Sequence, residues 1–301
     1  MLVRYFTGKN GGWPQTSGVN FDPLFRDVTM KNVNIITLVL LGAAVSAPAC
    51  AGIVVDGNID DWLTPGGKTT WTVANAGIHR AVEDQTGSTG AYLSPGYGGQ
   101  AYDAEALFAT ILGNTLYIAL ATGHNPITPT SGNNYGAGDF AIDFGRNGSY
   151  ELGINYRQAS GSAADTFGVQ GGVYQVSQWY YGLWNSAGQN DPTHPDLANP
   201  TSIRAGTKIG DASLAFSTIA KTGYGAHVND GHYFYEMSVN LDLLRGAGWD
   251  GSAFDIHWTE NCANDSIKVD PDKYVPEPGS LALLGAGVLG LAARRRRKTH
   301  A

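Results

Sequence analysis

Short runs of alternating polar and apolar residues, separated by turn residues, are the feature that most constrains the fold. Residues 139–144 and 150–156 alternate in this way, and Asn147-Gly148 between them is a strong hairpin signal. Further β-like runs are bounded by Gly, Asn, Asp or Pro; they are residues 53–55, 115–120, 172–176, 233–241 and 254–259. This spacing of strands and turns is typical of an antiparallel β-sandwich.

Helical periodicity is weak, and only residues 213–220 and 241–245 suggest short helical turns. No Pro/Ser-rich linker and no internal repeat divides residues 52–272. At over 200 residues, this segment is long enough to bury a core. We therefore expect one all-β domain, a jelly-roll-like antiparallel β-sandwich, over residues 52–272.

An apolar segment precedes this domain. Residues 33–45 are apolar, they follow the weakly basic start Met30-Lys31-Asn32, and small residues in an Ala-x-Ala pattern come next. These are the parts of a secretory signal peptide. We expect a signal helix within residues 30–51 that is cut after Ala51, with Ala49 as the second choice.

Residues 1–29 carry glycines, a proline and mixed charges without an apolar period. We expect an upstream or disordered extension, with Met30 as the true start. A long signal sequence that begins at Met1 is the alternative. Cys50 raises a lipoprotein alternative, but Ala47 stands where a lipoprotein signal would carry leucine.

The C-terminal tail, residues 275–298, combines a proline motif, an apolar run and a basic end. Its 15 uncharged residues, 279–293, are fewer than the 17 to 20 or so that usually span a bilayer as a helix. A membrane stop follows, formed by Arg294, Arg295, Arg296 and Arg297. Such basic residues stay on the cytoplasmic side, so we expect a transmembrane-like helix with the body outside the cytoplasm. A buried C-terminal helix is the alternative.

The order of these features resembles the PEP-CTERM sorting signal. The resemblance implies an exported protein that is held transiently in the inner membrane and then reaches the cell envelope or extracellular matrix. It implies the secretion machinery and an exosortase as partners. Pro276, Glu277 and Pro278 would be the residues that the exosortase recognises.

Charge and cysteine content limit the function of the body. Residues 52–274 contain 10 Lys and Arg against 23 Asp and Glu, a net charge of −13. Nucleic-acid binding needs a basic face, so no nucleic-acid partner is expected. Cys262 is the one cysteine in this segment, so no internal disulfide is expected.

Residues 53–62, with the sequence Ile-Val-Val-Asp-Gly-Asn-Ile-Asp-Asp-Trp, resemble the opening of DOMON-like and family-9 carbohydrate-binding-module-like β-sandwiches. Residues 114–120 and 138–144 resemble two further strands of those domains. The resemblance implies a β-sandwich that binds carbohydrate.

The same opening segment places Asp56, Asn58 and Asp60 at alternate positions, as in a calcium loop. Asp61 and Gly67 stand where an EF-hand needs Gly and Glu, so an EF-hand is rejected. We favour a turn held by Asx hydrogen bonds. A different calcium site that uses Asp60 or Asp61 is left open, and no other cofactor is expected.

Aromatic residues are densest around Trp179, Tyr180 and Trp184. Flat rings stack on sugars, which makes these residues candidates for carbohydrate binding. The alternative, which we favour, is a half-buried strand whose alternate rings fill the core. Tyr92, Tyr97 and Tyr102, in a Gly-rich loop, form a second candidate surface.

No strong catalytic signature is present. His257 and Cys262 lie in residues 257–267, which resemble a closing segment that recurs before PEP-CTERM tails. These two residues could ligate a metal, but a structural role is favoured. We predict a non-catalytic surface or matrix protein that binds exopolysaccharide. The alternatives are a glycan-processing hydrolase, which needs two carboxylates about 5 to 10 Å apart in a cleft, and a purely structural surface protein.

Overall fold

The computed structural model describes residues 52–87, 97–127, 136–156, 167–181, 200–263 and 265–271, all within the unit Ala49–Ala301. The predicted extension, signal helix and sorting tail therefore lie outside the described residues, and Trp184 does as well. No helix in the described ranges has the length and apolar character that crossing a membrane requires.

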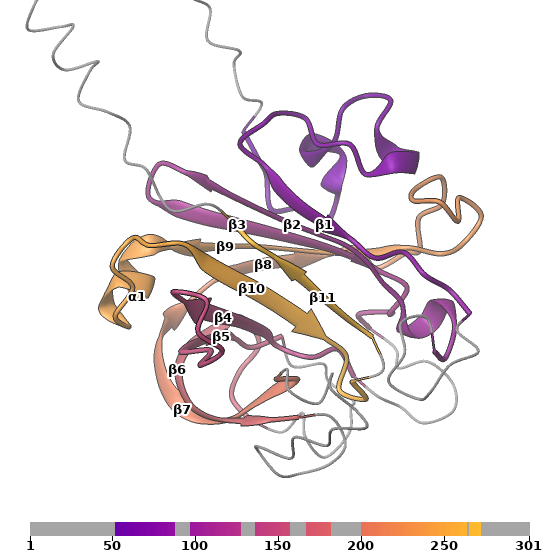
Figure 1. Ribbon diagram of the computed structural model, residues 1–301. Coiled ribbons are helices and arrows are strands. Elements are labelled where there is room, and N and C mark those ends of the chain that lie inside the picture. Colours follow the sequence, from indigo (N-terminus) through magenta and orange to yellow (C-terminus); the bar gives the residue numbers. More distant parts are fainter. Residues whose placement is uncertain are drawn as a thin grey trace, which may run out of the picture. The chain divides into compact units, whose positions relative to one another are not determined.

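Two antiparallel sheets make up the described domain (Figure 1). The first sheet has the order β1 (His79–Val82), β2 (Ala104–Leu112), β3 (Thr115–Thr122), β9 (Tyr233–Asn240) and β8 (Ser213–Phe216). The second has the order β11 (Ser266–Val269), β10 (Phe254–Thr259), β4 (Phe140–Phe144), β5 (Leu152–Ile154), β6 (Gly172–Tyr180) and β7 (Ser202–Asp211). The predicted all-β antiparallel sandwich is confirmed.

Helical structure in the described residues is short. It comprises the α-helix α1 (Leu241–Gly246) and the 3-10 helices η1 (Ile59–Trp62), η2 (Lys68–Thr70) and η3 (Gln100–Tyr102). The helical turn predicted at residues 241–245 is confirmed as α1, whose first turn is capped by the Asn240 side chain accepting from the Asp242 amide.

The main core lies between the sheets and includes Leu107, Leu120, Ile142, Tyr235 and Trp258, each fully buried. A second core covers the other face of the first sheet. There the segment before β1 packs Ile59, Trp62 and Trp71 against Phe108 and Phe234. The central strands of the first sheet are therefore buried on both faces, which removes the alternation expected of a half-exposed strand.

The hairpin predicted at Asn147-Gly148 is confirmed between β4 and β5. The Asp143 carboxylate accepts hydrogen bonds from the Asn147 amide at 2.9 Å and the Gly148 amide at 2.5 Å. Gly148 has a φ of +84°, a conformation that glycine adopts without steric cost. Local sequence therefore fixes this turn.

Two local predictions are wrong. Residues 53–55 are not a strand, because they belong to the segment that covers the first sheet. Residues 213–220 do not form a helical turn: Ser213–Phe216 is strand β8, and it pairs with β9 from Ser213↔Ser238 to Phe216↔Tyr235. Pairing with a neighbouring strand outweighs the local pattern at this edge.

A buried carboxylate anchors the Asp56–Trp62 segment. Glu236 of β9 is fully buried, and its Oε2 accepts from the amides of Asp56, Gly57 and Asn58 at 3.1, 2.7 and 3.0 Å. Its Oε1 accepts from Trp62 Nε1 at 2.7 Å. The Asp-Gly-Asn…Trp pattern of this segment thus supplies four N–H donors to one acid.

Candidate functional site

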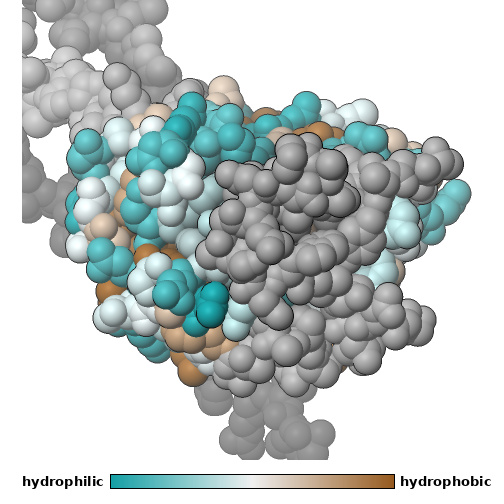
Figure 2. Space-filling model, turned by 60° about the horizontal axis from the view of Figure 1, so that its bottom comes forward, coloured by the Kyte–Doolittle hydropathy of each residue, from teal (hydrophilic) through white to brown (hydrophobic). Residues whose placement is uncertain are grey.

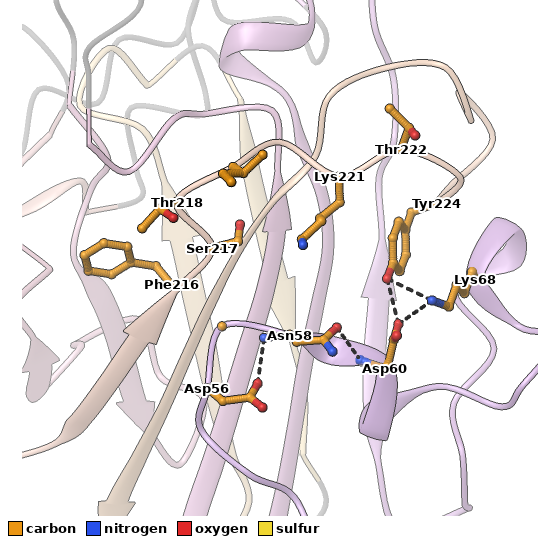
Figure 3. A pocket seen from close by; sticks show the side chains of 12 residues that line it. Asp56, Asn58, Asp60, Lys68, Phe216, Ser217, Thr218, Lys221, Thr222 and Tyr224 are labelled. Atoms are coloured by element: carbon orange, nitrogen blue, oxygen red, sulfur yellow. Dashed lines mark hydrogen bonds and ion pairs between the residues drawn. The ribbon is translucent and has the colours of Figure 1, made fainter.

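A polar pocket of about 510 Å³ lies where this anchored segment meets the chain after β8 (Figure 3). One wall carries Asp56, Asn58 and Asp60, and residues 216–222 form the other. Glu236 holds the first wall in place, because its carboxylate accepts from the backbone amides of Asp56 to Asn58. The pocket is therefore built from segments far apart in sequence.

Asp60, Lys68 and Tyr224 point toward one another at one end of the pocket (Figure 3). Lys68 Nζ lies 2.7 Å from Asp60 Oδ1, and the Tyr224 hydroxyl donates to the same oxygen at 2.6 Å. Partial burial acts to raise the pKa of Asp60, but the bonds from Lys68 and Tyr224 hold it below its ordinary value. Asp60 is thus an ionised acceptor.

Aromatic packing fixes Tyr224. Its ring stacks on Trp71 with centroids 5.9 Å apart and meets Phe234 edge-on at 4.8 Å. Only its hydroxyl end reaches the pocket. Hydroxyl, amide, carboxylate and ammonium groups therefore line a preformed cavity, with Lys221 extending into it from the 216–222 wall (Figure 3).

The calcium prediction at the opening segment is not supported by these contacts. The Asn58 amide donates to Asp56 Oδ1 at 2.9 Å, and the Asp60 amide donates to Asn58 Oδ1 at 3.3 Å. These bonds confirm the favoured Asx turn. Asp60 is occupied by Lys68, and Asp61 accepts from the Val54 amide at 2.8 Å.

Of the predicted carbohydrate-binding aromatics, Trp179 and Tyr180 are described, and they do not share one surface. Trp179 is only 5% exposed, packs with Tyr150, Tyr174 and Ile203, and donates from Nε1 to the Tyr150 carbonyl. Its ring fills a small core. Tyr180 is half-buried with the Arg204 guanidinium over its ring. A role for Tyr180 and Trp184 in carbohydrate binding stays a prediction.

Exposed apolar residues are few among the residues that the structure describes. On the face drawn in Figure 2, hydrophobic residues form small separate patches among hydrophilic ones. In the described ranges the exposed large hydrophobic residues are Val54, Val82, Tyr97, Ile127, Val169, Ile219 and Val228. In the second candidate aromatic surface, Tyr97 is exposed and Tyr102 is half-buried. Tyr92 lies outside the described residues.

His257 and Cys262 are both buried, at 2% and 1% exposure. His257 lies in β10 beside the ring of Tyr150, and Cys262 Sγ contacts Glu260 Oε2 at 3.6 Å. Neither belongs to the metal-ligand cluster found in the described part of the chain. Burial, followed by the charge of Lys268, lowers the pKa of His257 to about 3, against a hydrogen bond to the Pro200 carbonyl.

This burial predicts a pH dependence of stability. The unfolded chain takes up a proton at His257 below about pH 6.5 and the folded chain does not, so stability falls as the pH drops toward 3. Between pH 6.5 and 4.5, we expect wild type to lose about 2 kcal/mol more than His257→Asn. Urea unfolding at both pH values measures this, with the exposed His227→Asn as control. Equal losses in wild type and His257→Asn would contradict the prediction.

Three carboxylates that the sequence did not single out meet just beyond the C-terminal end of β1. Glu83 follows β1, Asp103 precedes β2, and Asp265 precedes β11. One oxygen from each lies within 4.8 Å of the others. No short motif joins residues so far apart in the chain, so sequence spacing gives no signal for them.

Comparison with known proteins identifies the tail. Residues 275–297 match the PEP-CTERM protein-sorting motif. The chain is therefore an exported, exosortase-sorted protein that is transiently membrane-associated before it reaches the envelope. No curated protein and no solved structure gives a significant match, so the resemblance of the body to DOMON-like and family-9 modules stays a prediction.

Proposed function

We propose that the mature domain is a non-catalytic surface or matrix protein that binds exopolysaccharide in the pocket between Asp56–Asp60 and residues 216–224. The observation that carries this proposal is the polar lining of the pocket. Polysaccharides present dense hydroxyl groups, and ionised or hydroxylated side chains pair well with them. The sorting signal supports the same proposal, since it delivers the domain to the envelope, where such polymers lie.

The geometry of the pocket suits binding without large rearrangement. Asp60 is an acceptor already oriented by Lys68 and Tyr224, and the Asx turn fixes Asn58. Groups held in place before the ligand arrives lose less conformational entropy on binding. Lys221, which is exposed, adds an ammonium donor from the other wall.

The hydrolase alternative needs a carboxylic acid of raised pKa beside a second carboxylate, with room for a sugar. Asp60 in the pocket has a lowered pKa. The acids with raised pKa values near 8 and 9, Asp265 and Asp103, are 2% and 0% exposed. A sugar has no access to these two acids. Glu83 beside them has a pKa raised to about 7 and is partly exposed, but its two neighbouring carboxylates are buried, so this cluster offers no pair of accessible acids. This favours a binding role over glycoside hydrolysis.

Replacing Lys221 with alanine tests the pocket. In affinity electrophoresis with dextran, a soluble β-glucan and alginate, we expect wild type to be retarded by at least one polymer. Lys221→Ala should raise the dissociation constant about tenfold, because it removes a charged hydrogen-bond donor. Lys208→Ala, which changes a surface lysine paired with Asp211 in β7, is the matched control and should bind like wild type.

Three outcomes count against this proposal. Absence of retardation by every polymer would leave a purely structural protein. Loss of binding in Trp184→Ala but not in Lys221→Ala would move the site to the aromatic segment. Release of reducing sugar ends during incubation would replace binding with hydrolysis. Trp179→Ala is unsuitable for this test, because that ring is part of a core.

A further inference from the structure

The cluster of Glu83, Asp103 and Asp265 brings three carboxyl groups together with no basic side chain of the described residues paired to them. Asp103 is fully buried, and neither of its carboxylate oxygens has a hydrogen-bond partner. Glu83 Oε1 also lacks one. Asp265 accepts backbone hydrogen bonds from Ala104 and Ser266, each at 2.8 Å, and its carboxyl group also lies within hydrogen-bonding reach of those of Asp103 and Glu83. A buried carboxylate without a partner is costly, so this arrangement indicates a missing positive charge.

Neighbouring groups do not supply that charge. Glu105 is already paired with His232 Nδ1 at 2.6 Å and with Gln100. Asp84 accepts from Trp71 Nε1 and from the Ala226 amide. In the described ranges, no lysine or arginine ion pair reaches the cluster; those pairs involve Asp60, Asp211, Asp242, Asp255 and Asp270. Burial, followed by nearby acids, raises the pKa of Asp103 to about 9.

We propose that Glu83, Asp103 and Asp265 bind one Ca²⁺ ion that joins the two sheets of the sandwich. All the ligand atoms are oxygens, which hard cations prefer. Ca²⁺ holds its oxygens at 2.3 to 2.6 Å, so two ligands on opposite sides of the ion lie about 5 Å apart. One oxygen from each of the three residues lies within 4.8 Å of the others, which is close enough for one ion to contact all three. Mg²⁺ draws its ligands closer and demands octahedral geometry.

The backbone of the cluster is fixed in advance. The Asp103 carbonyl accepts from Thr122 Oγ1 at 2.6 Å and from the Gly123 amide at 3.0 Å. The Asp265 carbonyl accepts from the Thr259 hydroxyl. The Glu83 amide donates to the Glu105 carbonyl at 2.9 Å, which continues the pairing of β1 with β2. Three carboxylates are thus presented from rigid positions at the ends of strands.

The location gives the ion a structural task. β1 is the edge strand of the first sheet, β11 is the edge strand of the second, and β11 packs against β1 and β2 (Figure 1). The Asp265 carboxylate already bridges the sheets through the Ala104 amide. An ion here closes this side of the sandwich. Extracellular modules bind Ca²⁺ at about 10⁻⁴ to 10⁻³ M, so the site would fill after export rather than in the cytoplasm.

Thermal unfolding of the purified full chain after EDTA treatment and dialysis tests this site. Adding about 5 mM CaCl₂ should raise Tm by about 3 to 8 °C, and MgCl₂ at the same concentration should raise it less. Elemental analysis of the calcium-loaded protein should give one Ca²⁺ per chain. Asp103→Asn should abolish the shift, because an amide cannot ionise to balance the charge of the bound ion.

Glu83→Gln changes a partly exposed ligand and keeps the test valid if Asp103→Asn does not fold; it too should weaken the shift strongly. Asp60→Asn is the control, because it changes the alternative calcium position suggested by the sequence, and it should keep the full shift. The proposal is overturned if calcium does not raise the Tm of wild type, if Mg²⁺ acts equally, if either cluster variant responds like wild type, or if Asp60→Asn loses the response. None of these results depends on glycan binding.

Discussion

Gly138→Ala is expected to destabilise the domain by about 3 kcal/mol or more. A Cβ atom at Gly138 would lie 1.9 Å from the Thr259 carbonyl oxygen and 2.5 Å from that of Thr201. Both neighbours are backbone atoms, at the end of β10 and just before β7, and cannot turn away as a side chain could. The Gly138 carbonyl also accepts from Trp258 Nε1 at 3.1 Å, so moving the glycine disturbs the main core.

Gly66→Ala is the matched control. Gly66 is exposed, has no positive φ, and has no atom within 4 Å of the position of an added Cβ. This substitution should be neutral or stabilise by up to about 1 kcal/mol, because it narrows the unfolded ensemble. Urea unfolding midpoints measure both effects. A difference below about 0.5 kcal/mol between the two variants would show that the strands yield easily at Gly138.

Glu236→Leu is expected to cost about 3 to 5 kcal/mol. It leaves three backbone amides and the Trp62 indole without the acceptor that now serves all four. Gly57 packs closely against the Phe216 backbone, since an atom at its Cβ position would lie only 2.6 Å away, and its φ is +83°. This close packing leaves the Gly57 amide little room to turn toward another acceptor. The Asp56–Trp62 segment should therefore detach from the first sheet.

Glu236→Gln should cost less, since its amide oxygen still accepts on one side. Trp62→Phe removes one donor and keeps a ring in the second core, so about 1 to 3 kcal/mol is expected. Hydrogen exchange at residues 56–62 reports detachment directly. Unchanged exchange in Glu236→Leu would refute the anchoring role. Because this segment forms one wall of the pocket, the leucine variant should also lose glycan binding.

The sequence predicts strands best where polar and apolar residues alternate or a turn residue is decisive. Alternation and Asn147-Gly148 identify β4, β5 and their hairpin. Strand β2 is missed, because Ala104–Leu112 is buried on both faces and is mostly apolar, with Glu105 and Thr110 as its two polar residues and no alternation. Strand β8 reads as a helical turn, because its pairing with β9 is not encoded locally.

The sites are harder to predict than the strands. Asp56 to Asp61 drew attention as a calcium loop, yet the partners that decide its role, Lys68, Tyr224 and Glu236, are distant in sequence. Glu83, Asp103 and Asp265 show nothing unusual as single residues. Only the pairing of β1 with β2 and the packing of β11 bring them together. The pocket and the carboxylate cluster are both created by contacts between segments far apart in the chain, which a single sequence does not reveal.

The pairing of β11 also decides how the domain responds to mechanical load. Val269 pairs with Ile256 and Ser266 pairs with Thr259, and the sorting signal follows further along the chain. Tension transmitted from a membrane-held tail therefore first meets Pro271, whose carbonyl accepts from Arg146 Nη2 at 2.9 Å, and then Val269. This tension loads the residue pairs between β10 and β11 one after another, as in peeling, rather than all at once, as in shear. Asp265 precedes β11 at the end opposite Val269, so its contacts are the last to separate as β11 peels from β10.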